Sequence, residues 1–339
     1  MKLKDDVAFK SAKELADRIR QKDFSCRDLL ELYISRIEKF NPTLNCVVTT
    51  NFDDARAQAD LADAEVSDGK TLGPLHGLPI TVKDALETAG IQSTGGAREL
   101  LGNIPERDAP VVKAVKDAGA IVMAKTNLPR WSGDLQTFND IFGTTNNPWD
   151  IDRVPGGSSG GAAAAVAAGL TAFEIGTDIG GSIRYPSSFC GAFGHKPSFG
   201  IVPSRGYLDH EFGGLTEADI NVVGPIARSA EDLEMLLNIM RRREAGPQAW
   251  LEPAPTGFEQ ARVAVWFEDD FCPVERKALQ VMEAAVARLQ HSGVRIFHDA
   301  KPDLDPEEAF GVGSALVYAA VSQSQPVSST QNGLSHRAW

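Results

Sequence analysis

The sequence predicts an α/β fold, because short apolar strands alternate with helical segments over most of its 339 residues. Two observations carry this prediction. Residues 121–124 are an apolar run of strand length, residues 173–175 also indicate a short strand, and each follows or precedes a segment with helical spacing. Residues 263–267, 274–290 and 294–297 then repeat the order strand, helix, strand. We therefore expect a sheet that is covered by helices.

The elements follow in order along the chain. Residues 9–39 carry apolar side chains at helical spacing and are interrupted near Asp23, which predicts two amphipathic helices. A third helix is expected at 52–68, and the apolar strand 78–82 leads directly into Lys83. The other expected elements are helix 109–118, strand 121–124, helix 162–168, strand 173–175, helix 230–240 and a last helix at 309–321.

No linker divides this pattern, so residues 1–321 are expected to form a single domain. Its parts would be N-terminal helices at 9–68, a core at 72–240 and a C-terminal α/β part at 261–321. Residues 322–339 are polar, lack periodicity and are expected to be disordered.

Composition excludes several functions. The net charge of −12 argues against a nucleic-acid partner, which requires clustered lysine and arginine. No apolar run is long enough to span a membrane, and the N-terminus lacks the core of a signal peptide. The four cysteines lie far apart and the six histidines lack the spacing of metal ligands. These observations predict a cytoplasmic protein with no metal and no membrane partner.

Two glycine-rich clusters contain the serines of interest, at residues 156–161 and 180–182. Glycine allows a ligand to approach backbone N–H groups closely. The strand 173–175 leads into the second cluster, where the N–H groups of Ile179, Gly180, Gly181 and Ser182 could surround an oxyanion. The plainer interpretation is a tight turn with an unreactive serine.

Other interpretations of the first cluster are weaker. A flexible linker is not usually followed by AAAAVAAGL, and a phosphate-binding loop needs Gly-Lys-Ser/Thr where Gly161 leads into Ala162. Residues 156–160 match the G-x-S-x-G pattern of a nucleophile elbow, but a turn precedes them instead of a strand. A Ser-His-Asp hydrolase is therefore the second hypothesis, with His195 or His210 as its base.

Lys83 is the alternative base. A lysine at the end of a strand is usually solvated, yet burial would lower its pKa enough for proton transfer near neutral pH. Asp178 and Arg184 flank the serine loop with opposite charges, and we expect them to pair and hold the loop rigid.

Several motifs together resemble the amidase signature family. They are GGSSGG, GTDIGGSIRYP and CGAFGHKP within residues 156–197, with further matches at 77–84, 125–129, 142–149 and 224–229. The resemblance extends over about residues 10–300. It implies a mixed β-sheet with helices on both faces and the hydrolysis of a small carboxamide to an acid and an amine or ammonia, without a cofactor.

The resemblance also implies a Ser-Ser-Lys triad. Ser182 would be the nucleophile, Ser158 a bridging serine held by a cis peptide, and Lys83 the neutral base. Ile179, Gly180, Gly181 and the Ser182 amide would form the oxyanion hole. Further expected roles are support of the site by Ser159 and Thr177 and an acyl pocket formed by Trp131, Leu135, Gln136 and Thr137.

Members of this family are usually longer, so the chain is expected to lack a C-terminal portion of the fold. This leaves a further alternative to an active amidase, namely an inactive homologue or an amidotransferase-like subunit that works in a complex. The resemblance also allows a homodimer.

Overall fold

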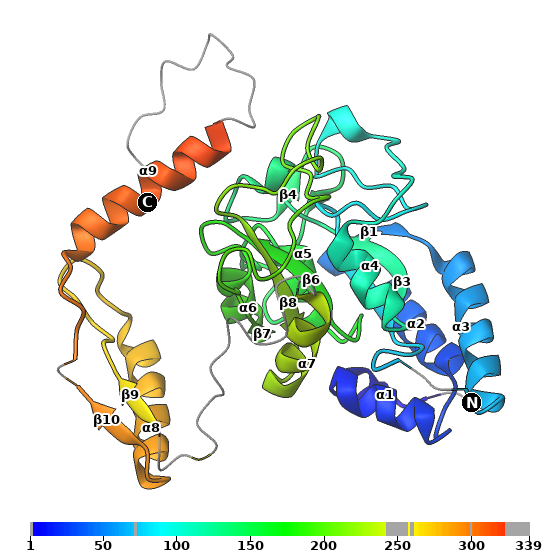
Figure 1. Ribbon diagram of the computed structural model, residues 1–339, viewed down its shortest axis with the longest axis horizontal. Coiled ribbons are helices and arrows are strands. Elements are labelled where there is room, and N and C mark those ends of the chain that lie inside the picture. Colours follow the sequence, from blue (N-terminus) through cyan, green and yellow to red (C-terminus); the bar gives the residue numbers. More distant parts are fainter. Residues whose placement is uncertain (1–2, 71–72, 242–256, 258–260, 299, 323–339) are drawn as a thin grey trace. The chain divides into compact units, whose positions relative to one another are not determined.

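The computed structural model describes residues 3–70, 73–241, 257, 261–298 and 300–322 of the chain. The described residues divide into two compact units, one that contains residues 3–241 and 320–322 and one that contains residues 257–319 (Figure 1). Helices and strands alternate through both units, which confirms the α/β class. Among the described residues, no helix is long and apolar enough to cross a membrane.

The N-terminal segment forms the helices that the periodicity predicts. Ser25 separates the two amphipathic helices, because its hydroxyl accepts the N–H of Asp28 while the Asp28 carboxylate accepts the N–H of Ser25. This reciprocal cap explains the interruption near residue 23. The elements are the 3-10 helix η1 (Asp5–Phe9) and the α-helices α1 (Ala12–Arg20), α2 (Cys26–Leu44) and α3 (Phe52–Ser67).

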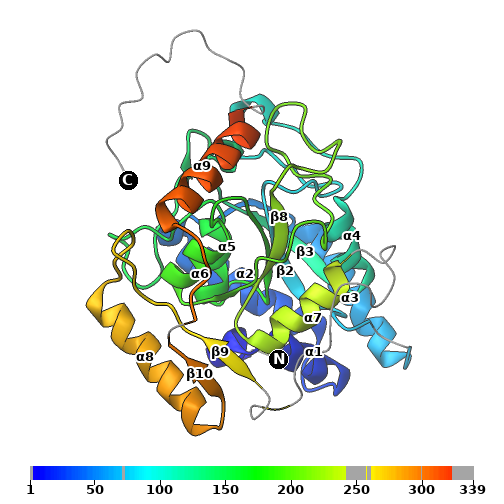
Figure 2. The ribbon, with the colours of Figure 1, turned by 60° about the vertical axis from the view of Figure 1, so that its left-hand side comes forward.

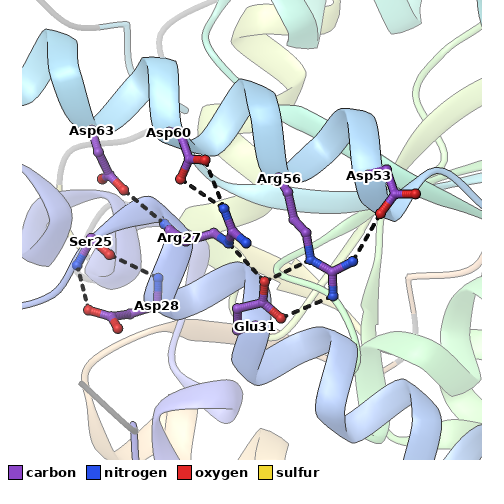
Figure 3. Close-up of polar contacts among 8 residues, drawn as sticks. All are labelled: Ser25, Arg27, Asp28, Glu31, Asp53, Arg56, Asp60 and Asp63. Atoms are coloured by element: carbon purple, nitrogen blue, oxygen red, sulfur yellow. Dashed lines mark hydrogen bonds and ion pairs between the residues drawn. The ribbon is translucent and has the colours of Figure 1, made fainter.

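Charged side chains join α2 to α3 (Figure 3). On α2, Glu31 accepts hydrogen bonds from both Arg27 and Arg56. Arg27 also donates to Asp60 on α3, and Arg56 to Asp53. Asp53 is fully exposed and the other side chains are partly exposed, so solvent screens these ion pairs and they contribute little to stability. The network orients two helices that apolar burial already holds together.

The first unit contains two three-stranded sheets. In the first, of order β1-β3-β2, β3 (Ile121–Thr126) pairs antiparallel with β1 (Val47–Thr50) and parallel with β2 (Pro79–Lys83). In the second, of order β6-β8-β7, β8 (Val222–Ala227) pairs antiparallel with β6 (Glu174–Asp178) and β7 (Phe193–Gly194). The mixture of parallel and antiparallel pairs matches the expected mixed sheet. A short hairpin joins β4 (Phe138–Asn139) to β5 (Gly143–Thr144).

Side-chain hydrogen bonds connect the two sheets along β2 and β6. The N–H of Thr81 donates to Thr171 Oγ1 at 2.9 Å, and the N–H of Lys83 donates to Glu174 Oε2 at 3.1 Å. One backbone bond, from Ala172 N to Pro79 O at 3.3 Å, completes the contact. Because side chains occupy the place of a regular ladder, the end of β2 is fixed beside the start of β6.

The remaining helices of this unit surround the sheets (Figures 1 and 2). Helix α5 contacts β2, β3, β6 and β8, and it approaches the backbone closely. A Cβ on Gly161 would lie 2.5 Å from the backbone N and O of Asn127, so only glycine fits there. The bounds are η2 (Arg98–Leu100), α4 (Pro110–Asp117), η3 (Arg130–Ser132), α5 (Gly160–Ala167), α6 (Arg184–Cys190) and α7 (Ala230–Met240).

The second unit is small. Strands β9 (Arg262–Ala264) and β10 (Arg295–Phe297) pair in parallel, and α8 (Arg276–His291) connects them as the sequence predicts. Helix α9 (Pro306–Ser322) follows. Few described side chains of this second unit are buried, among them Val265, Val286 and Val294. The tail predicted at 322–339 lies outside the described residues from 323 onward.

Candidate active site

Lys83 is the centre of a buried cluster of hydroxyl groups. It is the last residue of β2 and is completely buried. Its Nζ lies 2.7 Å from Ser158 Oγ, 2.7 Å from Thr177 Oγ1 and 3.1 Å from Ser159 Oγ. In the described part of the chain, no carboxylate is close enough to form an ion pair with this amine. The structure thus brings together four residues that sequence reasoning named.

Burial sets the charge of this amine. Desolvation lowers the pKa of Lys83 to about 7, although the negative charges of Glu174 and Asp178 oppose the shift. A neutral amine donates two hydrogen bonds and accepts one, so three hydroxyl neighbours satisfy it completely. At neutral pH a substantial fraction of Lys83 can therefore accept a proton.

The two serines of the first cluster lie at the start of α5. The peptide bond between Gly157 and Ser158 is cis, as the resemblance implies. Ser159 is the N-cap residue of α5, and its N–H donates to the carbonyl oxygen of Ser182 at 3.1 Å. This bond ties the first glycine-serine cluster to the second and places Ser158 near Ser182. No strand precedes Ser158 over residues 145–157, so the nucleophile-elbow hypothesis lacks its structural context.

Ser182 lies in the loop that follows β6 and is nearly buried, with 4% of its surface exposed. Its Oγ has no hydrogen-bond partner among the described residues. In particular, it is not hydrogen-bonded to Ser158 Oγ, which contacts Lys83 Nζ instead. The hydroxyl is therefore free to turn toward Ser158 or toward a bound ligand.

Asp178 holds the Ser182 loop. Its carboxylate accepts the N–H of Gly181 at 2.8 Å and that of Ile183 at 3.1 Å, and it pairs with Arg184 at 2.9 Å. Burial alone would raise the pKa of Asp178, but Arg184 and the two N–H groups outweigh burial and hold it below its usual value. The predicted pair thus exists, and Asp178 also binds the backbone on both sides of the serine.

This contact changes the set of free N–H donors. The N–H of Gly181 is already engaged by Asp178, whereas those of Ile179, Gly180 and Ser182 have no partner among the described residues. Gly181 has φ +120°, and a Cβ there would lie 2.1 Å from the Tyr185 ring. Three of the four predicted oxyanion donors therefore remain open.

The predicted acyl-pocket segment lies against the cis peptide. A Cβ on Gly157 would meet the backbone of residues 134–136 at 2.7–2.9 Å. Gln136 is half-buried and its Oε1 lacks a partner in the described structure. Thr137 is fully buried, and its hydroxyl donates to Gly156 O and accepts the N–H of Gly160. Thr137 thus holds the serine cluster in place, and its hydroxyl is not available to a substrate. Trp131 is buried with φ +52°.

Neither histidine considered as a base contacts the serines. His210 bonds to Asp209 through its ring, and the ring of His195 has no hydrogen bond to a described residue. The geometry therefore favours Lys83 over a histidine base.

Sequence reasoning missed three buried ionisable groups near Lys83. They are Glu174 on β6, Lys125 on β3 and Asp84 directly after β2, all completely buried. Burial raises the pKa of Glu174 to about 7 and that of Asp84 to about 6, and it lowers the pKa of Lys125 to about 8. A charged residue inside an apolar strand was the signal that could have found Glu174 and Lys125.

Comparison with protein families gives one match over most of the chain. A family model described as Amidase matches residues 28–335. A glutamyl-tRNA(Gln) amidotransferase subunit of Carboxydothermus hydrogenoformans is 39% identical over 235 residues, which cover 69% of this chain and 47% of that protein. The chain thus spans about half the length of the curated relatives that it matches.

Solved structures agree with this match. A bacterial aryl acylamidase that belongs to the amidase signature enzymes superposes with a TM-score of 0.80 at 27% identity, over 93% of this chain and 66% of that one. The peptide amidase from Stenotrophomonas maltophilia superposes with a TM-score of 0.79 at 27% identity, over 95% of this chain and 68% of that one.

Proposed function

Because the chain belongs to the Amidase family of amidase signature enzymes, we propose that it hydrolyses a carboxamide to a carboxylic acid and an amine or ammonia. The observation that carries the proposal is the buried Lys83 amine, 2.7 Å from Ser158 Oγ and without an ion-pair partner in the described structure. A buried amine of lowered pKa next to a serine hydroxyl is a general base prepared for nucleophilic catalysis.

The proposed reaction has two halves. Ser182 Oγ attacks the amide carbonyl carbon while its proton passes to Ser158 Oγ and the Ser158 proton passes to Lys83. This transfer requires Ser182 Oγ to turn to within hydrogen-bonding distance of Ser158 Oγ. The N–H groups of Ile179, Gly180 and Ser182 stabilise the oxyanion, and each such donor can be worth about 3 kcal/mol. The C–N bond then breaks, and the proton returns through Ser158 to the leaving nitrogen.

Water completes the cycle. It attacks the acyl-enzyme and gives its proton through Ser158 to Lys83. The bond between Ser182 Oγ and the acyl carbon then breaks, the proton returns through Ser158 to Ser182 Oγ, and the acid is released. In the 131–137 segment, Ser132 Oγ and Gln136 Oε1 both lack a partner in the described structure, and we propose Gln136 as the side chain that contacts the acyl group.

Trapping of the acyl-enzyme tests this function. The protein is incubated with a panel of primary amides, aryl amides and C-terminal peptide amides in the presence of hydroxylamine, and hydroxamates are measured by mass spectrometry. We expect hydroxamate from at least one amide class and none from Ser182→Ala. Absence of hydroxamate from every class would contradict the proposal.

A second candidate is the glutaminase part of an amidotransferase. The observation in its favour is that the curated relatives at 39–43% identity are named as subunits of glutamyl-tRNA(Gln) amidotransferase. With glutamine added to the panel and ammonia measured, selective release of ammonia from glutamine would favour this candidate, and turnover of simple amides without glutamine turnover would favour a free-standing amidase. The substrate is in either case a small amide, and a homodimer remains a proposal.

The pH dependence of acylation follows from the pKa of Lys83. Protonated Lys83 cannot accept a proton, so the rate of acylation of Ser182 should be low in acid and rise with pH through about 7. Labelling rates with a fluorophosphonate between pH 5 and 9 measure this profile, at about half-unit steps. A rate that is flat across pH 7 would contradict a Lys83 base.

A further inference from the structure

Glu174 is a buried carboxyl that three elements share. It is the first residue of β6 and is completely buried. Its Oε2 accepts the N–H of Lys83 at 3.1 Å and the N–H of Ile175 at 2.6 Å. Its Oε1 accepts the hydroxyl of Thr126, the last residue of β3, at 2.6 Å. One side chain therefore contacts the ends of β2, β3 and β6.

These contacts fix where Lys83 lies. Residues Lys83 and Thr126 are paired in the parallel register of β2 and β3, and Glu174 bonds to both of them. Because no regular ladder joins β2 to β6, the Glu174 carboxyl supplies the hydrogen bond that holds the backbone of Lys83 against β6. The loop with Ser182 starts at the other end of β6, so this bond sets the base in register with the nucleophile.

The charge of Glu174 also acts on its neighbours. When ionised, which its raised pKa places above about 7, Glu174 favours the protonated forms of Lys83 on β2 and Lys125 on β3, and it disfavours the thiolate of Cys46 before β1. Two other carboxylates lie nearby: Asp178 adds to the effect on Lys83, and Asp84 acts on Lys125. The pKa of Cys46 is raised to about 12, so its thiol stays neutral, whereas Lys83, Lys125, Asp84 and Glu174 itself change charge near neutral pH.

We propose that Glu174 is a positioning residue for the Lys83 base: its carboxyl fixes the end of β2 against β6, and its ionised form places a negative charge near Lys83 that opposes the loss of the Lys83 proton. The role in catalysis rests on the proposed amide hydrolysis, whereas the control of Lys83 protonation does not. The two parts can therefore be tested separately.

The first variant is Glu174→Gln, which removes the charge and keeps the shape. The amide oxygen can accept the N–H groups of Lys83 and Ile175, and the amide nitrogen can donate to Thr126. We expect the midpoint of Lys83 deprotonation, followed by NMR of ¹³Cε-labelled lysine, to fall by about one pH unit. The Lys83 signal is identified by its loss in Lys83→Met. A purely structural role for Glu174 would leave the midpoint unchanged.

Asp232→Asn is the matched control. Asp232 on α7 is also completely buried and also accepts two backbone N–H groups, those of Ala12 and Lys13, each at 2.9 Å. It contacts none of the residues around Lys83 in the described structure. We expect Asp232→Asn to leave the Lys83 midpoint where it is in the wild type.

A second variant covers the case in which Glu174→Gln does not fold. Thr126→Val keeps the carboxyl but removes the hydroxyl that stabilises its ionised form, so Glu174 carries less charge at neutral pH. The Lys83 midpoint should then fall in the same direction by a smaller amount. An unchanged midpoint in the folded variants would overturn the proposal.

Labelling of Ser182 by a fluorophosphonate separates the two proposals. In Glu174→Gln the acid limb of the labelling profile should move to lower pH together with the NMR midpoint. A shifted midpoint with no labelling of the wild type at any pH would support the role of Glu174 and contradict amide hydrolysis. Labelling of the wild type together with unshifted Lys83 midpoints in the variants would support amide hydrolysis and contradict the role of Glu174.

Discussion

Replacing Lys83 with methionine should slow the reaction of Ser182 with a fluorophosphonate by about 10³-fold, because general-base catalysis by a positioned side chain typically contributes roughly 10²–10⁴-fold. Methionine keeps the unbranched apolar stem of lysine and removes the amine that contacts Ser158, Ser159 and Thr177. Rates are measured from the intact mass as a function of time at pH 8. Circular dichroism establishes that the variant is folded.

The histidines provide the control for this prediction. His195 and His210 contact neither Ser158 nor Ser182 in the described structure. His195→Ala and His210→Ala should therefore label at the wild-type rate. If a histidine variant were inactive and Lys83→Met were active, the Ser-His-Asp hypothesis would replace the Lys83 base.

Replacing Asp178 with asparagine should slow labelling of Ser182 by about 10²-fold, because a displacement of about 1 Å in a catalytic group can cost that much. Asparagine places an N–H₂ group where the carboxylate now accepts the N–H of Gly181 or Ile183. One of those N–H groups loses its partner, and the loop that carries Ser182 changes conformation. The variant should also unfold at lower temperature, as calorimetry would measure, since a buried donor is left unpaired.

Arg184→Ala is the matched comparison for Asp178. The Arg184 side chain is 54% exposed whereas that of Asp178 is fully buried, so water can replace the guanidinium more easily than the carboxylate. Arg184→Ala leaves both backbone hydrogen bonds to Asp178 in place and should label faster than Asp178→Asn. The opposite order would mean that the ion pair, and not the bonds to the loop backbone, holds the nucleophile.

Much of the fold follows from local pattern. The amphipathic helices α2 and α3, the buried strands β2, β3 and β6, and the order β9, α8, β10 are all predicted from the local sequence pattern. Strand β8 was missed because its sequence contains glycine and proline, although it pairs with β6 over five residues. Helix α6 was missed because Pro186 and two serines lie within its seven residues. Both elements depend on tertiary pairing that a local window does not contain.

The candidate site was also predictable only in part from the local sequence. Residue chemistry alone identified the serine loops, the oxyanion donors and the Asp178–Arg184 pair, and it left Lys83 and the histidines as rival bases. The family resemblance joined Lys83 to Ser158, two residues separated by 75 positions in sequence but by 2.7 Å between Nζ and Oγ. Contacts of this kind depend on how β2 packs against α5, which no spacing rule encodes.

The hydrogen-bond partners of individual site groups could not be predicted, because several acceptors and donors in the folded protein compete for each group. The N–H of Gly181 faces Asp178, and the hydroxyl of Thr137 is used by the backbone of Gly156 and Gly160. Glu174 attracted no attention as a charged residue in a short strand, because its role becomes visible only once β2, β3 and β6 meet at its carboxyl.

The most direct test of a Ser182 nucleophile is the intact mass of the protein after treatment with a fluorophosphonate, on the wild type and on Ser182→Ala. We predict one covalent adduct on the wild type and none on Ser182→Ala. An adduct of equal yield on Ser182→Ala, or no adduct on a folded wild type, would contradict the assignment of Ser182 as the activated nucleophile.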